Sequence, residues 1–395
     1  MPAYWTIVAF LLAWNAVPWM VIGSLFSPVV PGGWRAVLVV ALVLFLPVMV
    51  IAGNLGGDAY PSATTRLWLY RPAWYTQLFL PLIAIAGVVG LVVGVPFGAA
   101  QVSGRWTAGA MGVLLLVLAV WGYAGTRQLV VRPLDVRFAG LPAALEGMRI
   151  VQLSDTHVGP HTSRRHLARV ADAVRDARPD LVVLTGDQVD DFARDVEPLG
   201  RAFGGLSAPL GVYAIAGNHD VYAGWPAVRR GMEGLGWTVL VNEAMPVERN
   251  GTRFWIAGTG DPAGGRPGQG PVAPDVERTM TAIPPDAFSL VLAHNPALWP
   301  ALAQRGANLT LSGHTHYGQL AIPRLGWSVA SAFLDLAMGV HRRDDSVLYI
   351  NPGTNFWGIP FRIGALPEVT VVTLHGSPVV PAHEGAHAGS TSAAP

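Results

Sequence analysis

The sequence of 395 residues contains no cysteine and no lysine, and only 13% of its residues are charged. The absence of cysteine excludes disulfides, thiolate metal ligands and cysteine nucleophiles. All 26 basic residues are arginine, a bias that we attribute to base composition rather than to function. The net charge of +1 provides no basic field for nucleic acid, so we expect no nucleic-acid partner.

The few charges are unevenly distributed along the chain. Residues 1–126 carry five of them, whereas residues 127–395 carry 22 arginines and 24 acidic residues. The first part also contains four long apolar runs, with Trp and Tyr near their ends, as is typical of membrane helices. The four runs are 4–26, 36–53, 76–97 and 106–125. Each approaches the ~20 residues that a helix needs to cross a bilayer, so we predict a transmembrane anchor of about four helices over residues 1–126.

Four spans would place both ends of the chain on one side of a cell membrane. The loops on that side carry five arginines near the spans, and those on the other side carry two. The positive-inside rule therefore predicts a cytoplasmic location for the rest of the chain. No Asp, Glu or His lies within the four runs, which favours an anchor over a transporter.

From about residue 148 the pattern changes to short apolar strands. The spacing of apolar residues predicts a helix over 164–177, and the early strand–helix–strand order suggests parallel pairing. The later strands come with few helices, which indicates a mixed sheet or a second sheet. We predict a linker over 127–147, an α/β domain over 148–375 and a disordered tail over 376–395.

Polar side chains follow the predicted strands at the points where ligands gather in α/β sheets. They are Asp155, His157, Asp187, Asn218, His219, Asp220, His294, His314 and His316. Each alone has a structural explanation, such as a helix cap for Asp187 or a core position for His294. His314 and His316 would share one face if their strand stays extended. Oxygen and imidazole donors in this order, without sulfur, indicate a centre for Mn, Fe or Zn.

Five segments carry a resemblance to a known family. SDTHVG, GDQVDD, GNHD, AHNP and GHTHYGQ resemble the signatures of calcineurin-like metallophosphoesterases, over about residues 148–375. The resemblance is to the bacterial branch with N-terminal membrane segments, which includes phosphodiesterases and pyrophosphatases of lipid-linked sugar nucleotides. Thr156 and Tyr317 stand where Leu and Gly are more usual, at positions that supply no ligand. The resemblance implies a four-layer αββα sandwich of two mixed sheets with helices outside.

The resemblance also implies roles for individual residues. Asp155, His157 and His316 would hold a first divalent metal. Asn218, His294 and His314 would hold a second, with Asp187 bridging the two. His219 would donate a proton to the leaving oxygen. Asp220 would either orient His219 or cap a helix.

The implied function is a membrane-anchored phosphoesterase with two divalent metals, Mn, Fe or Zn. A hydroxide bridging the metals would attack a phosphodiester or pyrophosphate bond of a small-molecule substrate, with a lipid-linked substrate as one candidate. Two alternatives stay open: a phosphomonoesterase or protein phosphatase on the same site, and a non-catalytic membrane sensing module. Of the other residues, we expect His166 to be exposed, and His161, Asn351 and Arg362 either to reach the site or to serve only loop structure.

Overall fold

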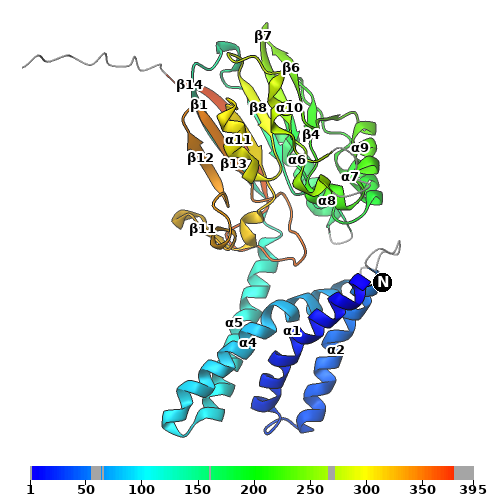
Figure 1. Ribbon diagram of the computed structural model, residues 1–395, viewed down its shortest axis with the longest axis vertical. Coiled ribbons are helices and arrows are strands. Elements are labelled where there is room, and N and C mark those ends of the chain that lie inside the picture. Colours follow the sequence, from blue (N-terminus) through cyan, green and yellow to red (C-terminus); the bar gives the residue numbers. More distant parts are fainter. Residues whose placement is uncertain (1, 55–63, 65, 160–161, 266–271, 378–395) are drawn as a thin grey trace, which may run out of the picture.

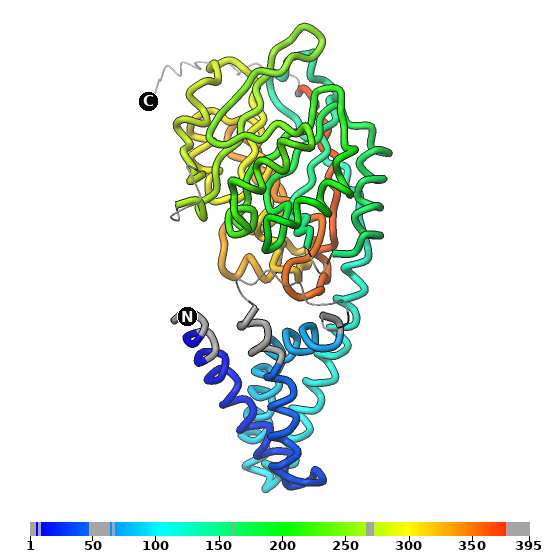
Figure 2. Tube along the Cα trace, turned by 90° about the vertical axis from the view of Figure 1, so that its right-hand side faces the viewer, coloured from blue at the N-terminus to red at the C-terminus, as the bar shows by residue number. Residues whose placement is uncertain are grey.

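The computed structural model describes residues 2–54, 64, 66–159, 162–265 and 272–377. Figures 1 and 2 show a bundle of long helices at one end and a sandwich of two sheets at the other. The predicted tail lies outside the described residues from position 378 onward, and so does His161.

In the part of the chain that the structure describes, four long helices form the bundle. They are α1 (Pro2–Phe26), α2 (Gly33–Asn54), α4 (Arg71–Gly94), which follows a π-helical turn, and α5 (Ala100–Gly125). Among the described residues, three stretches are long and apolar enough to cross a membrane, namely Ala9–Phe26, Trp68–Phe97 and Ala100–Gly125. The apolar stretch described in α2 is shorter, Gly33–Leu46, so the fourth span stays a prediction.

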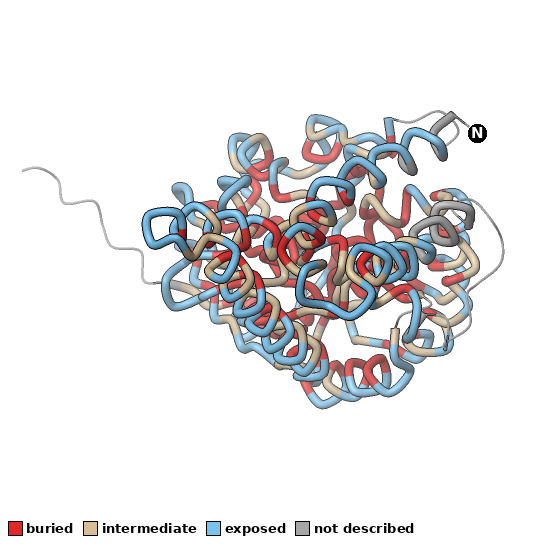
Figure 3. Tube along the Cα trace, turned by 90° about the horizontal axis from the view of Figure 1, so that it is seen from below, coloured by how far each residue is buried: buried red, intermediate tan, exposed pale blue. Residues whose placement is uncertain are grey.

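Small residues and one polar pair hold the bundle together. A Cβ at Gly90 of α4 would lie 2.7 Å from the carbonyl oxygen of Ser103 on α5, so only glycine allows these helices to pack so closely. Asn15 of α1 donates to Gln77 of α4 at 2.7 Å, and both side chains are buried. Much of the outer surface of the helices is exposed when viewed from the bundle end (Figure 3), as lipid-facing surfaces would be.

The first sheet has the strand order β1–β14–β2–β3–β4–β5. Its strands are β1 (Val130–Ala139), β14 (Glu368–Ser377), β2 (Arg149–Leu153), β3 (Leu181–Leu184), β4 (Val212–Ala214) and β5 (Thr238–Val239). The predicted linker over 127–147 is therefore wrong, because β1 lies within it and pairs in parallel with β14. No local pattern indicated this strand, since it contains Pro133, is half exposed and lies at the sheet edge beside the last strand of the chain.

The second sheet has the strand order β12–β13–β9–β8–β7–β6. Its strands are β12 (Gly339–Arg343), β13 (Ser346–Ile350), β9 (Leu309–Ser312), β8 (Ser289–Leu292), β7 (Thr252–Gly258) and β6 (Glu243–Arg249). A short separate ribbon is formed by β10 (Ala321–Ile322) and β11 (Trp327–Ser328).

The alternation of side chains along the strands builds the layers. Ile150 and Leu181 of the first sheet pack between the sheets against Leu290 and Leu309 of the second. Their neighbours point outward, so Val151 and other residues of the first sheet pack on the outer helices. These helices are α6 (Arg164–Asp176), α7 (Val196–Phe203) and α9 (Trp225–Gly234) on one face, and α10 (Val276–Thr281) and α11 (Trp299–Gln304) on the other. The predicted four-layer αββα sandwich is confirmed.

Candidate metal centre

Five strands deliver the predicted polar residues to one edge of the sandwich. Each of β2, β3, β4, β8 and β9 ends two to four residues before a predicted site residue. The seven residues expected to be ligands lie close together at this edge. They are Asp155, His157, Asp187, Asn218, His294, His314 and His316.

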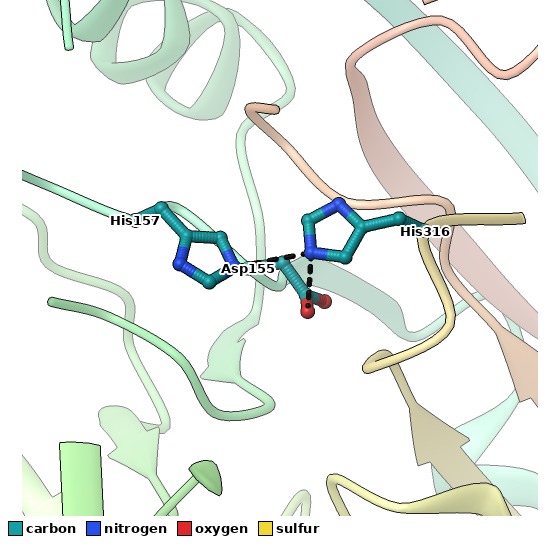
Figure 4. Close-up of side chains that lie close together, drawn as sticks. All are labelled: Asp155, His157 and His316. Atoms are coloured by element: carbon teal, nitrogen blue, oxygen red, sulfur yellow. Dashed lines mark hydrogen bonds and ion pairs between the residues drawn. The ribbon is translucent and has the colours of Figure 1, made fainter. Parts of the chain in front are cut away.

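One group of donors is made of Asp155, His157 and His316 (Figure 4). The Nε2 atoms of the two histidines lie 3.0 Å apart, and His316 Nε2 lies 3.2 Å from Asp155 Oδ1. All three side chains are buried, and their donor atoms are close enough to hold one metal ion.

A second group lies beside the first. His294 Nε2 is 3.2 Å from Asp187 Oδ2 and 3.2 Å from Asn218 Oδ1. His314 Nδ1 is 2.9 Å from the same oxygen of Asn218. Asp187 Oδ2 also lies 3.7 Å from His157 Nε2, so this carboxylate stands between the two groups.

The hydrogen bonding of His294 provides a test of whether a cation fits. Its Nδ1 lies 2.8 Å from the carbonyl oxygen of Thr185, to which it can only donate. When this imidazole is neutral, its Nε2 is an electron-pair donor, and it faces oxygens of Asp187 and Asn218. Several donors facing one point require a positive charge among them, so the residues fit a bound divalent metal.

The carboxylates of Asp155 and Asp187 are ionised, but the imidazoles of the site differ from one another. Burial opposes protonation of His294 and His157, yet the neighbouring carboxylates outweigh it and raise the pKa of both, that of His294 well above its usual range. Burial opposes ionisation of Asp155, but the neighbouring His316, His294 and His157 outweigh it and hold the pKa of Asp155 well below its usual range. Burial lowers the pKa of His316 and of His314 to about 4. Carboxylate and neutral imidazole are the protonation states that bind metals.

The backbone at the site is strained. Asp155, His157, Asp187, His314 and His316 all have φ between 38° and 71°, in the left-handed region that residues other than glycine rarely adopt. Such conformations cost about 1–3 kcal/mol each and are concentrated at functional sites. The expectation that His314 and His316 share one face of an extended strand is wrong. β9 ends at Ser312, and the left-handed turns after it direct both imidazoles into the site.

His219 lies next to the donors but has a different partner. Its Nδ1 is 2.8 Å from the backbone carbonyl of Asp190, to which it donates, and its ring lies 4.7 Å from the ring of His157. Asp190 also accepts from His157 Nδ1 at 3.2 Å through its carboxylate. Asp190 lies in the segment GDQVDD, but no role was predicted for it.

Asp220 does not contact His219 in the way that one interpretation required. Its carboxylate accepts from the backbone N–H groups of Gly217, Gln188 and Val189 at 2.9–3.1 Å. It thus caps the short helix α8 (Asn218–Tyr222) and ties it to the loop that carries Asp187. Burial, followed by repulsion from Asp187, raises the pKa of Asp220 to about 7.

Arg362, which was predicted either to reach the site or to serve only loop structure, contacts a candidate ligand. It is fully buried, and its guanidinium lies 2.8 Å from His316 Nδ1. It also donates to the carbonyl oxygen of Pro352 at 2.6 Å. Burial lowers its pKa to about 9. Local sequence held no signal for this contact because the two residues are 46 positions apart.

Two further expectations concern residues close to the same loop. His166 is buried rather than exposed, because its Nε2 lies 2.8 Å from the carbonyl oxygen of Thr354 and the loop covers this side of α6. Asn351 has a structural contact, donating to Thr370 at 2.8 Å.

Comparison with known proteins agrees with this geometry. The family model of the calcineurin-like phosphoesterases matches residues 148–318. A zebrafish (Danio rerio) protein named transmembrane protein with metallophosphoesterase domain is 33% identical over 276 residues, which are 66% of this chain and 61% of that protein. The metallophosphoesterase YkuE of Bacillus subtilis is 32% identical over 242 residues, 59% of this chain and 81% of that protein.

Among solved structures, the calcineurin-like phosphoesterase YfkN from Bacillus subtilis aligns with a TM-score of 0.34 and 14% identity, over 51% of this chain and 87% of that chain. A likeness of this size has no bearing on substrate or mechanism. This chain spans only 61% of the length of the transmembrane relative from zebrafish. The family model and the identity to YkuE establish that the chain belongs to the calcineurin-like phosphoesterases.

Proposed function

We propose that this protein is a membrane-anchored phosphoesterase that uses two divalent metal ions to hydrolyse a phosphodiester or pyrophosphate bond. The observation that supports this proposal is the placement of Asp187 between two groups of buried donors, 3.2 Å from His294 and 3.7 Å from His157. A carboxylate between two such groups is suited to bridge a pair of ions.

In this proposal the two groups divide the ligands. Asp155, His157 and His316 hold one ion. Asn218, His294 and His314 hold the other, and Asp187 contacts both. Two divalent ions at this point, from among Mn, Fe and Zn, would neutralise phosphate oxygens and lower the pKa of a bound water toward neutrality.

In this proposal His219 donates the proton that the leaving oxygen takes up. Its Nδ1 donates to the carbonyl of Asp190, which fixes the ring and leaves Nε2 available to protonate a leaving oxygen. Its side chain is less buried than those of His157 and His294, as expected for a group that meets substrate. Asp220 supports His219 indirectly, because it fixes the amino end of the helix on which His219 lies.

The membrane anchor is proposed to comprise residues 1–126, with the phosphoesterase domain beginning at Val130. The arginine count at the helix ends favours a cytoplasmic catalytic domain in a cell membrane. A lipid-linked substrate would agree with such an anchor. Fusions of a reporter to the carboxyl end would test the orientation.

The test of the chemistry is hydrolysis of bis-p-nitrophenyl phosphate by the full chain in detergent. We expect activity with Mn²⁺, Fe²⁺ or Zn²⁺, and a loss on the order of 10³-fold in Asp187→Asn. The matched control is Asp286→Asn, which changes an exposed carboxylate in the same way and should keep the full rate.

Two outcomes would contradict the proposal. One is the absence of hydrolysis with every divalent metal, and the other is an Asp187→Asn variant as active as Asp286→Asn. A p-nitrophenyl phosphate monoester assayed in parallel separates the diesterase from a phosphomonoesterase, since a faster rate on the monoester would favour the latter.

A further inference from the structure

The directions of the strands place the candidate metal centre at the end of the domain that faces the helical bundle. α5 ends at Gly125 and β1 begins at Val130, so β1 runs away from the bundle. β14 runs parallel to β1, and β2 runs antiparallel to β14. Strands β2, β3 and β4 therefore run back toward the bundle, and their carboxyl ends carry Asp155, Asp187 and Asn218 to that end.

One loop connects the site to the helices directly. The backbone N–H of Arg362 donates to the carbonyl of Gly122 in the last turn of α5 at 2.9 Å, while its guanidinium lies 2.8 Å from His316. The hydroxyl of Tyr75 on α4 donates to the carbonyl of Pro360 at 2.8 Å. A single residue, Arg362, thus contacts both the candidate ligand His316 and α5, a helix long and apolar enough to cross a membrane.

An exposed apolar surface lies at this same end. We define the ribbon patch as Ile322, Leu325, Trp327, Phe333, Leu334 and Trp357. Phe333 is 82% exposed and Leu325 is 75% exposed, whereas apolar patches of this kind are rare on domains surrounded by water. The only charge within residues 320–334 is Arg324, and aromatic residues beside arginine are typical of membrane interfaces.

The ribbon patch is joined to both the bundle and the site. Leu320, at the start of the ribbon, pairs with Ile363, which follows Arg362. Figure 1 shows β11 at the end of the domain nearest the helices. The ring of Trp357 lies 5.6 Å from that of His219, so the patch reaches the rim of the site.

We infer that the ribbon patch inserts into the headgroup region of the same bilayer that holds the helices, and that the site takes its phosphorylated substrate from that membrane. The substrate class is then a lipid whose phosphodiester or pyrophosphate lies at the bilayer surface. The membrane contact stands independently, whereas the substrate class rests on the proposed function. The bilayer is the occupant because the ribbon is linked to α5 through Ile363 and Arg362, and a membrane around that helix would cover the patch without another protein.

The absence of cysteine makes the contact directly measurable. Phe333→Cys would carry the only thiol of the full chain, to be labelled with bimane after reconstitution into phosphatidylcholine–phosphatidylglycerol vesicles. Nitroxide lipids should quench this label several-fold more than a label on Asn250→Cys, at the β6–β7 turn remote from the bundle. Equal quenching at the two positions would overturn the membrane contact. So would quenching between labels on different copies without quenching by lipid, because it would assign the patch to a second copy.

Activity tests the substrate class separately. The variant Leu325→Ser/Phe333→Ser changes no residue of the metal centre. Its rate on hexadecyl p-nitrophenyl phosphate embedded in the vesicles should fall by about tenfold, with unchanged hydrolysis of soluble bis-p-nitrophenyl phosphate. Equal rates of the variant and wild type on the embedded diester would overturn the inference about substrate. If the wild-type protein hydrolyses neither the embedded nor the soluble diester, the proposed reaction is refuted. The quenching result would still decide the membrane contact.

Discussion

Replacement of Gly125 by alanine should damage the metal centre from the end of a membrane helix. Gly125 is the last residue of α5, and an alanine Cβ there would lie 1.9 Å from the backbone carbonyl oxygen of Arg362. Carbon atoms pack against such atoms at ~3.5 Å, so the two backbones would have to separate by about 1.5 Å. Rotation of a side chain cannot relieve this overlap, because the backbone fixes the Cβ position and the atom that it meets is a backbone oxygen.

The size of the effect follows from what Arg362 holds. A backbone shift moves its guanidinium away from His316, now 2.8 Å away, and breaks its N–H bond to Gly122. Displacements of about 1 Å near catalytic groups cost on the order of 10²-fold in rate. We therefore expect kcat for bis-p-nitrophenyl phosphate to fall on the order of 10²-fold in Gly125→Ala.

The matched control is Gly109→Ala in the same helix, where a Cβ would meet nothing within 4 Å. Both variants would be purified in detergent, assayed with saturating Mn²⁺ and titrated for metal affinity by calorimetry. The reasoning fails if Gly125→Ala keeps the wild-type rate and affinity. It fails equally if Gly109→Ala loses as much, because the loss would then come from helix packing in general.

Three further predictions concern metal, pH and helix packing. EDTA should abolish hydrolysis and lower the melting temperature, with both restored by Mn²⁺, because the metal binds only the folded donors; an unchanged melting curve would contradict this. Burial raises the pKa of Asp195 to about 7, so the folded state binds its proton more tightly and stability falls as pH rises from about 4 to 7. Asp195→Asn should therefore raise the melting temperature by about 2–4 °C at pH 8 and have little effect below pH 4, and equal shifts at both pH values would refute it. A double-mutant cycle of Asn15→Leu and Gln77→Leu in detergent should give a coupling of about 0.6–2 kcal/mol, and a value near zero would show that the 2.7 Å bond does not join α1 to α4.

Periodicity and strand-end chemistry predicted much of the catalytic fold. The helix expected over 164–177 is α6, and short strands begin close to residue 148, as expected. These elements were visible because each buries one face against a neighbouring layer and therefore has a regular apolar pattern. β1 was missed for the opposite reason, since it is an edge strand whose partner is the last strand of the chain.

The candidate site was predictable only as far as its donors lie next to strand ends. His294 follows β8 by two residues, and parallel strands bring such positions to one edge. Asp190 and Arg362 contact the donors His157 and His316 from loops. Such a contact does not require a position directly after a strand, so the strand-end pattern did not indicate these two residues. The buried state of His166 depends on a loop nearly 190 positions away, and no helical pattern reports such a contact.

The position of Arg362 argues that the anchor is part of the catalytic architecture rather than a tether. A buried guanidinium requires several acceptors, and the loop that supplies them is held on its other side by α4 and α5. The helices therefore help to stabilise the arrangement in which Arg362 contacts His316. An enzyme that acts at the bilayer surface needs its metal centre at a fixed distance from the lipid. A loop that contacts both α5 and His316 would fix that distance.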